Sequence, residues 1–226
     1  MTKIITKQHQ DQAVKALQRL IAKPSAFDEK TVSSTTPFGK GIDAALDEVL
    51  AIAKENGLQT YKDPNGNYGW AEIGTGDKTF GIIGHMDTVP VGNLSDWEHG
   101  PYSGDIVDGI IYGRGAQDDK GPAMATMFAV KAILDADYQL NCKIRFIFGT
   151  DEETLWRDMD VYNKIEPQID FGIAPDAEFP LIYAEKGLEQ AYLVGPGSVS
   201  YTHLTLPTIN PVLISVVSVP FRKYNQ

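Results

Sequence analysis

The 226-residue sequence has few cysteines, no long apolar run and few basic residues, and each of these features excludes a class of protein. It holds one cysteine, Cys142, so it cannot build an internal disulfide framework, and it is compatible with a reducing compartment. No apolar run approaches the roughly 18 residues of a membrane span, and the start, MTKIITKQHQDQ, lacks an apolar signal core. Basic residues are scarce, because 20 Lys and Arg stand against 30 Asp and Glu, a net charge of −10. We therefore expect a cytoplasmic protein with no nucleic-acid partner and no membrane partner.

Acidic residues are missing altogether from the segment 199–226, although the preceding chain holds all 30 of them. Within this segment, VSYTHLTLPT matches the translation of one reading frame of a transposase adapter used in shotgun sequencing libraries. The alternative is an ordinary β-rich terminus, but a match of this length favours a foreign origin. We predict two parts, a partial catalytic domain over residues 1–198 and a non-native tail over residues 199–226.

The spacing of apolar residues predicts that helices and strands alternate along the chain. Helices are expected over residues 8–23, 42–57 and 122–136. The stretch 58–74, LQTYKDPNGNYGWAEIG, has the turn residues of a β-hairpin at its centre. Further strands are expected over residues 78–87, 142–153, 171–178 and 181–195. This alternation predicts an α/β fold, a three-layer sandwich around a mixed sheet.

Acidic residues and one histidine cluster at the ends of the expected strands or in the loops that follow strands. The four clusters are GHMD (84–87), GRGAQDDKG (113–121), GTDEE (149–153) and APDAEF (174–179). Open α/β sheets bind ligands outside the carboxyl ends of their strands, and carboxylates gathered there repel one another unless a cation neutralises them. A histidine with several Asp and Glu suits zinc, with manganese or cobalt as second choices.

The pair His85 and Asp87 illustrates the two interpretations of such a cluster. Side chains two apart on an extended segment point the same way, so one can ligate a metal while the other orients its ring. An isolated His-x-Asp is more often a polar loop after a buried strand. The three further acidic clusters favour the metal site.

The motifs GHMDTVP, GRGAQDDKGP, TDEET, PDAEFP and AEKG, in this order, resemble those of the dinuclear zinc aminoacylase and dipeptidase family. The resemblance covers Met1 to about Gly197, and the last two motifs are most similar to those of its PepV-type bacterial dipeptidases. It implies the amino-terminal part of a zinc-peptidase catalytic domain. The lid domain, which in this family is inserted after the AEKG region and contacts the substrate, would be absent.

The resemblance implies four metal ligands. His85 and Asp176 would ligate one Zn²⁺, Glu153 would ligate the second, and Asp118 would bridge both. It also implies a cis peptide bond between Asp118 and Asp119.

Two further residues receive catalytic roles by the same resemblance. Glu152 would be the general base, which takes a proton from metal-bound water and passes it to the leaving amine. Asp87 would hydrogen-bond the far side of the His85 ring and fix its tautomer.

The function implied by the resemblance is zinc-dependent hydrolysis of dipeptides by the parent protein. Two alternatives stay open, a deacylase of the same family acting on N-acyl amino acids and a non-catalytic metal-binding fragment. The family pattern needs another histidine on the second zinc, and His203 is not assigned because it lies in the adapter-like segment. We therefore expect this chain alone to be inactive.

Several other residues are expected to be structural. His9 should lie on a helix surface, and His99 should be solvated on a loop. Met124 and Met127 should fill the core. Lys120 and Lys186 should pair with nearby carboxylates.

Overall fold

The computed structural model describes residues 4–177 and 181–184. The chain divides into two units, Met1–Ala177 and Glu178–Gln226, and the description below concerns the first. Most of the expected strand segment 181–195 and the whole of the predicted tail, 199–226, lie outside the described residues.

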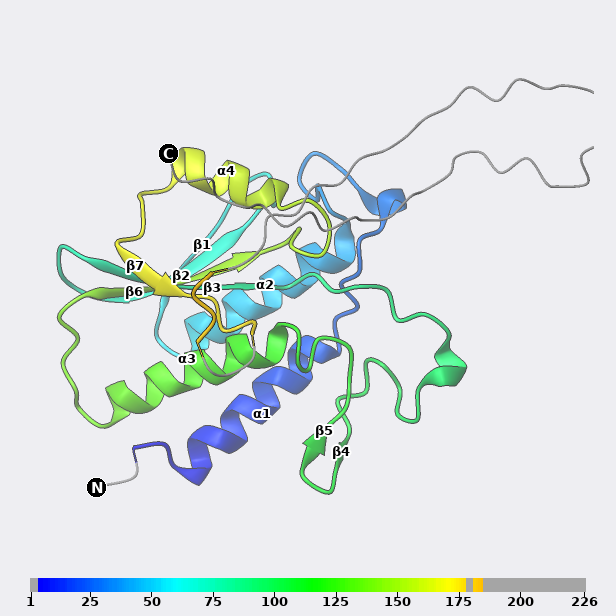
Figure 1. Ribbon diagram of the computed structural model, residues 1–226, viewed down its shortest axis with the longest axis horizontal. Helices are drawn as coiled ribbons and strands as arrows, with labels where there is room; N and C mark the ends of the chain where they lie inside the picture. Colours follow the sequence, from blue (N-terminus) through cyan, green and yellow to red (C-terminus); the bar gives the residue numbers. More distant parts are fainter. Residues whose placement is uncertain (1–3, 178–180, 185–226) are drawn as a thin grey trace, which may run out of the picture. The chain divides into compact units, whose positions relative to one another are not determined.

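A five-stranded mixed sheet forms the centre of this unit (Figure 1). In spatial order its strands are β1 (Gln59–Lys62), β2 (Gly69–Gly74), β6 (Lys143–Gly149), β3 (Thr79–His85) and β7 (Phe171–Ile173). β1 and β2 form the expected hairpin, and β2 runs antiparallel to β6. β3 runs parallel to both β6 and β7, so these three strands end at the same edge of the sheet. A separate two-stranded hairpin joins β4 (Ile106–Val107) to β5 (Ile110–Ile111).

Helices cover both faces of the sheet (Figure 1). α1 (Lys7–Ile21), α2 (Lys40–Glu55) and α3 (Lys120–Asp135) cover one face, and α4 (Arg157–Ile165) covers the other. Two short 3₁₀ turns, η1 (Glu29–Thr31) and η2 (Leu94–Asp96), lie in the connections. The prediction of a three-layer α/β sandwich with a mixed sheet is confirmed. Among the described residues, no helix combines the length and the apolar character needed to cross a bilayer.

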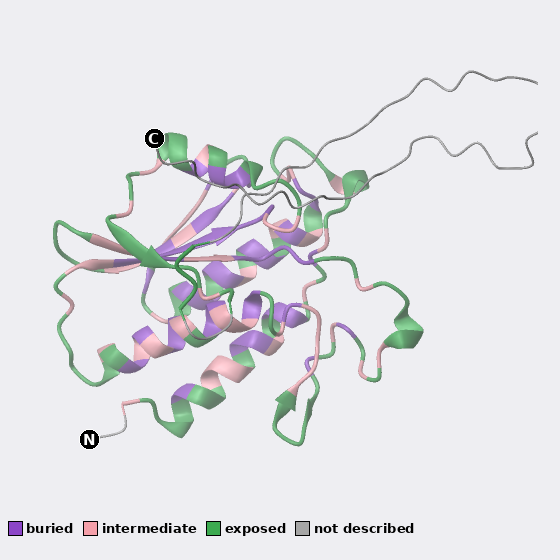
Figure 2. Cartoon of the chain, in the orientation of Figure 1, coloured by how far each residue is buried: buried purple, intermediate pink, exposed green. Residues whose placement is uncertain are grey.

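The two faces of each central strand bury different apolar clusters. On β6, Ile144, Phe146 and Phe148 join the larger cluster with α1, α2 and α3, whereas Ile147 joins a smaller cluster beside α4. This alternation follows from the two-residue repeat of a strand. Figure 2 shows the buried positions concentrated where the helices meet the sheet. Met124 and Met127 of α3 are buried in the larger cluster, as predicted.

The start of α1 corrects one prediction. Thr6 and His9 form a reciprocal capping box, in which each residue satisfies the other's backbone N–H. His9 is buried rather than on the helix surface, because its ring also lies 3.1 Å (Nε2) from Asp135 Oδ2 at the end of α3. The imidazole therefore helps to join α1 to α3.

Candidate metal centre

The proposed ligands lie where the three parallel strands end. His85 is the last residue of β3, and Glu152 and Glu153 follow β6 within a few residues. Asp176 follows β7, and Asp118 lies two residues before the start of α3. The sheet topology therefore brings together residues that are far apart in the sequence, as expected for the carboxyl edge of parallel strands.

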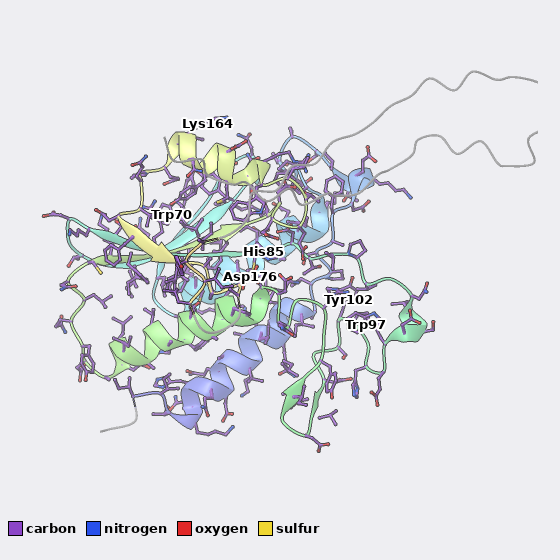
Figure 3. All side chains as sticks on the ribbon, in the orientation of Figure 1. Trp70, His85, Trp97, Tyr102, Lys164 and Asp176 are labelled. Atoms are coloured by element: carbon purple, nitrogen blue, oxygen red, sulfur yellow. The ribbon has the colours of Figure 1, made fainter. Side chains whose placement is uncertain are left out.

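His85 is the centre of this cluster, and its side chain is only 3% exposed. Its Nε2 atom lies 2.9 Å from Asp118 Oδ1, 3.3 Å from Asp176 Oδ2 and 3.8 Å from Glu152 Oε2. Figure 3 labels His85 and Asp176, which lie close together beside the central strands. The predicted convergence of these side chains is confirmed.

Two groups of donor atoms are compact enough to hold an ion. One consists of His85, Asp118 and Asp176, and the other of His85, Glu152 and Glu153; in each group all donor atoms lie within 4.8 Å of one another. One imidazole nitrogen with several carboxylate oxygens is a donor set that fits zinc, and it also fits manganese or cobalt. The structure brings all five residues together, whereas their division between two ions stays a prediction.

Asp87 is buried beside His85. The His85 Nδ1–H donates to the Asp87 backbone carbonyl at 3.0 Å, and the Asp87 carboxylate Oδ1 lies 3.3 Å from the same nitrogen. The expected hydrogen bond between Asp87 and the far side of the His85 ring is therefore present, and the backbone carbonyl of Asp87 accepts it. The other carboxylate oxygen, Oδ2, accepts the backbone N–H of Glu153 at 2.9 Å. Asp87 therefore contacts a member of each group, a link that the sequence pattern did not indicate.

Asp119 was missed in the sequence, although it stands beside Asp118 in the DD pair. Its side chain is fully buried, and Oδ2 accepts the backbone N–H of His85 at 3.1 Å. A Cβ atom on Gly84 would lie 2.4 Å from that oxygen, so a larger residue at this point of β3 would displace the Asp119 carboxylate. The Asp118–Asp119 peptide bond is cis, as predicted.

Burial and mutual charge shift the pKa values of the cluster. Burial raises the pKa of Glu152, Glu153 and Asp176 above the usual carboxyl range, and the charge of Asp118 adds to this for the last two. Burial by itself lowers the pKa of His85, but the carboxylates around the ring outweigh it and raise this pKa to about 10. A positive charge is therefore strongly favoured at this point of the structure.

Lys120, which lies outside the cluster of donor atoms, has structural partners. Lys120 is buried, and its Nζ donates to the backbone carbonyls of Leu20 at 3.0 Å and Lys23 at 2.9 Å. The expected pairing with carboxylates is therefore wrong for Lys120, which instead ties the start of α3 to the end of α1. Burial lowers the pKa of this ammonium group to about 8. Lys186 lies outside the described residues.

His99 belongs to neither group of donor atoms. Its Nδ1 lies 3.4 Å from Asp105 Oδ2, and its ring centroid lies 4.3 Å from that of Tyr112. Its ring is thus partly packed within the loop, whereas the sequence indicated a solvated side chain.

Comparisons with known proteins add to this geometry. Residues 81–222, more than half of the chain, match the family model described as Peptidase family M20/M25/M40. This range includes most of the segment 199–226, whose foreign origin stays a prediction.

Individual relatives match over most of this chain. YtjP of Bacillus subtilis (strain 168) is 41% identical over 183 residues, which are 81% of this chain and 39% of that protein. The beta-Ala-Xaa dipeptidase of Lactobacillus delbrueckii subsp. lactis is 41% identical over 180 residues, 79% of this chain and 37% of that protein. The structure of human carnosine dipeptidase 1 shares the fold with a TM-score of 0.62 at 24% identity, over 81% of this chain and 41% of that one. The chain thus spans well under half the length of the relatives that it matches.

Proposed function

The chain belongs to the peptidase family M20/M25/M40, and on that premise we propose that it carries the metal-binding and proton-transfer residues of a dipeptidase. The observation that carries this proposal is the cluster around His85, in which Asp118 and Asp176 form one compact donor group with the imidazole and Glu152 and Glu153 form another. The similarity to a beta-Ala-Xaa dipeptidase supports dipeptides as the substrate class. The proposed substrate has a free amino terminus.

Each of four residues is proposed to hold metal. His85 and Asp176 would hold one ion, Glu153 would hold the second, and Asp118 would serve both. Zinc is the first choice, because the set mixes imidazole and carboxylate donors, and manganese or cobalt are the alternatives. When bound, two such ions supply a Lewis acid for the scissile carbonyl and a water whose pKa lies near neutrality.

Asp87 is proposed to set the state of the imidazole. Because the Asp87 carbonyl accepts the proton on His85 Nδ1, a neutral ring presents the lone pair of Nε2 toward Asp118 and Asp176. The same residue fixes the Glu153 backbone through its Oδ2 atom. It therefore orients both ligand groups at once.

Glu152 is proposed to move the proton. Hydrolysis forms a bond from a water oxygen to the peptide carbonyl carbon and breaks the bond from that carbon to nitrogen. The proton that leaves the water must reach the departing amine, and a partly buried carboxylate can accept it and then return it. Burial raises the pKa of Glu152, which favours the protonated form that makes the second transfer.

The 226-residue chain alone is proposed to hydrolyse dipeptides only at the background rate. Within residues 4–177 and 181–184, His85 is the one imidazole present in either donor group. The carboxylates of the second group would hold their ion weakly, because each terminal ligand that is missing is replaced by water.

The test combines metal binding with activity. Zinc binding to the 226-residue chain is measured by calorimetry for the native protein, Glu152→Gln and His85→Ala, and each is then assayed on dipeptides and N-acyl amino acids. We expect zinc binding to survive in Glu152→Gln and to fall at least about tenfold in His85→Ala. Sequencing the source gene beyond Ser198 gives any continuation, and a protein with that continuation should hydrolyse dipeptides about 10³-fold faster than its Glu152→Gln form.

Two results would contradict the proposal in different ways. If the native chain binds no zinc, or if the extended protein and its Glu152→Gln form are equally active, the metal-dependent mechanism is wrong. If the 226-residue chain itself hydrolyses dipeptides and Glu152→Gln abolishes this, only the statement about its inactivity is wrong.

A further inference from the structure

Glu152 and Glu153 lie on the turn 150–156, which joins β6 to α4. A buried carboxylate fixes the first residue of this turn. Asp158, in the first turn of α4 and 1% exposed, accepts the backbone N–H of Thr150 at 2.6 Å. The point where the chain leaves the sheet is therefore tied to the helix that follows.

Arg157 closes the same turn from its other end. The guanidinium donates to Asp151 through two nearly equal contacts, Nε to Oδ2 and Nη2 to Oδ1, both 2.7 Å long. The Arg157 backbone N–H also donates to Asp151 Oδ2, and the Asp151 carbonyl accepts the backbone N–H of Trp156. Asp151 is 1% exposed, so the residue next to Glu152 is a buried anion held at several points.

The guanidinium also reaches a distant part of the chain. Its central carbon lies 5.0 Å from the ring centroid of Phe38 and 5.9 Å from that of Phe27. Both aromatic residues belong to the connection between α1 and α2. A planar guanidinium can stack on a ring and grip a carboxylate at two points, which a lysine ammonium cannot do.

We infer that Arg157 is a positioning residue, which acts through Asp151 to hold the turn so that Glu152 and Glu153 face His85. This inference rests on the proposed metal site, because it assigns the turn a role in holding the second ion. It predicts an effect confined to one group of donors. Asp118 and Asp176 lie on other elements and accept no hydrogen bond from Arg157 in the part of the chain that the structure describes.

The experiment titrates the 226-residue chain with Co²⁺ and follows both calorimetry and the visible absorption of the bound ion. Variants Arg157→Ala and Arg157→Lys are compared with the native protein, and Asp176→Asn identifies the titration step that belongs to the His85, Asp118 and Asp176 group. Arg19→Ala is the matched control. Arg19 makes a similar two-point contact with Glu55, and the side chains of Arg19 and Arg157 are 41% and 48% exposed.

We expect Arg157→Ala to lower the affinity of the second Co²⁺ step about tenfold, which is the usual effect of losing a residue that supports a metal ligand. The affinity of the first step should change by less than about twofold. Arg157→Lys should recover less than half of the lost affinity, since a lysine restores the charge but not the two-point contact with the Asp151 carboxylate. Arg19→Ala should change neither step, even where thermal unfolding shows an equal loss of stability.

Other results would overturn the inference. Equal weakening of both steps in Arg157→Ala, or full recovery in Arg157→Lys, would show a general structural or charge effect. A native chain that takes both ions while Arg157→Ala behaves identically would contradict the inference alone. A native chain that takes no second ion would contradict the two-ion assignment, and this inference with it.

Discussion

Two regions of the central sheet bury different kinds of side chain, apolar ones on the face beneath α1, α2 and α3 and charged ones at the ends of the parallel strands. Where the sheet faces α1, α2 and α3, side chains such as Leu46, Met127 and Phe146 form a continuous apolar cluster. Where β3, β6 and β7 end, the buried side chains include instead His85, Asp87, Asp119, Asp151 and Asp158. The face covered by α1, α2 and α3 supplies most of the hydrophobic stabilisation, because its buried side chains are mainly apolar. The edge concentrates charge at a cost in stability, which is typical of functional sites.

The hydrogen bonding of the edge shows this cost in particular atoms. Within the described residues, the buried Oδ1 atoms of Asp87 and Asp119 have no hydrogen-bond partner. Burial also raises the pKa of Asp119 to about 7 and that of Asp158 to about 6. An unpaired buried acceptor costs on the order of 1–3 kcal/mol, so these two Oδ1 atoms lower the stability of the fold. The comparison thus predicts that stability and metal binding can be changed separately.

The largest expected effect is a loss of stability on the face covered by α1, α2 and α3. Leu46 of α2 is fully buried, and Leu46→Ala should lower the free energy of unfolding by about 3 kcal/mol through lost transfer energy and a residual cavity. Urea denaturation measures this change. Calorimetry on the folded protein should give a zinc affinity within about twofold of the native value, because Leu46 belongs to an apolar cluster that includes none of the proposed ligands.

A matched control is Ile165→Ala at the exposed end of α4. Ile165 is 62% exposed, so this truncation should cost less than about 1 kcal/mol. If Leu46→Ala weakens zinc binding by a large factor in the folded protein, the two regions are coupled and the comparison fails.

The next effect, of about tenfold per pH unit, concerns the proton on His85. The carboxylates around this ring raise its pKa from 6.5 to about 10. In chelator-treated protein the resulting stabilisation is complete below about pH 6.5, and it is lost as the pH rises through about 10. A metal ion requires the neutral ring, so binding at pH 7 releases this proton, and zinc affinity should rise about tenfold per pH unit from pH 7 to 9.

Calorimetry in two buffers of different ionisation enthalpy counts the protons released by the first ion. His85→Ala is the control, because it lacks the titrating ring and should release about one proton fewer. A zinc affinity that is independent of pH in this range would show that His85 is neutral before the metal binds, or that it is not a ligand.

The sequence allowed much of the fold to be predicted, because local patterns determine it. Helical periodicity located α1, α2 and α3 to within two residues, and the Pro-Asn-Gly stretch located the turn between β1 and β2. α4 was not predicted, because its nine residues bury only Met159 and Tyr162 as apolar side chains. A helix this short leaves too little periodicity to recognise.

The candidate site was likewise predicted only in part. The ligands stand at strand ends, where the sequence shows acidic clusters, and the family resemblance assigned their roles. The supporting contacts left no local pattern, since Asp119 meets the His85 backbone across 34 positions and Arg157 meets Phe27 and Phe38 through the tertiary fold. Burial of His9 likewise depends on Asp135, at the far end of α3.

The smallest expected effect comes from deleting residues 199–226. We propose that this segment is foreign to the family, which its lack of Asp and Glu and its adapter-like VSYTHLTLPT both support. On this proposal the segment was not selected together with the core, so the deletion should change the free energy of unfolding by less than about 0.5 kcal/mol. Urea denaturation of the native, deleted and Gly/Ser-replaced forms measures this, and the replacement separates the effect of length from that of sequence. A loss of several kcal/mol in both altered forms would show that residues 199–226 contribute to the folded domain, and the boundary at residue 198 would then be wrong.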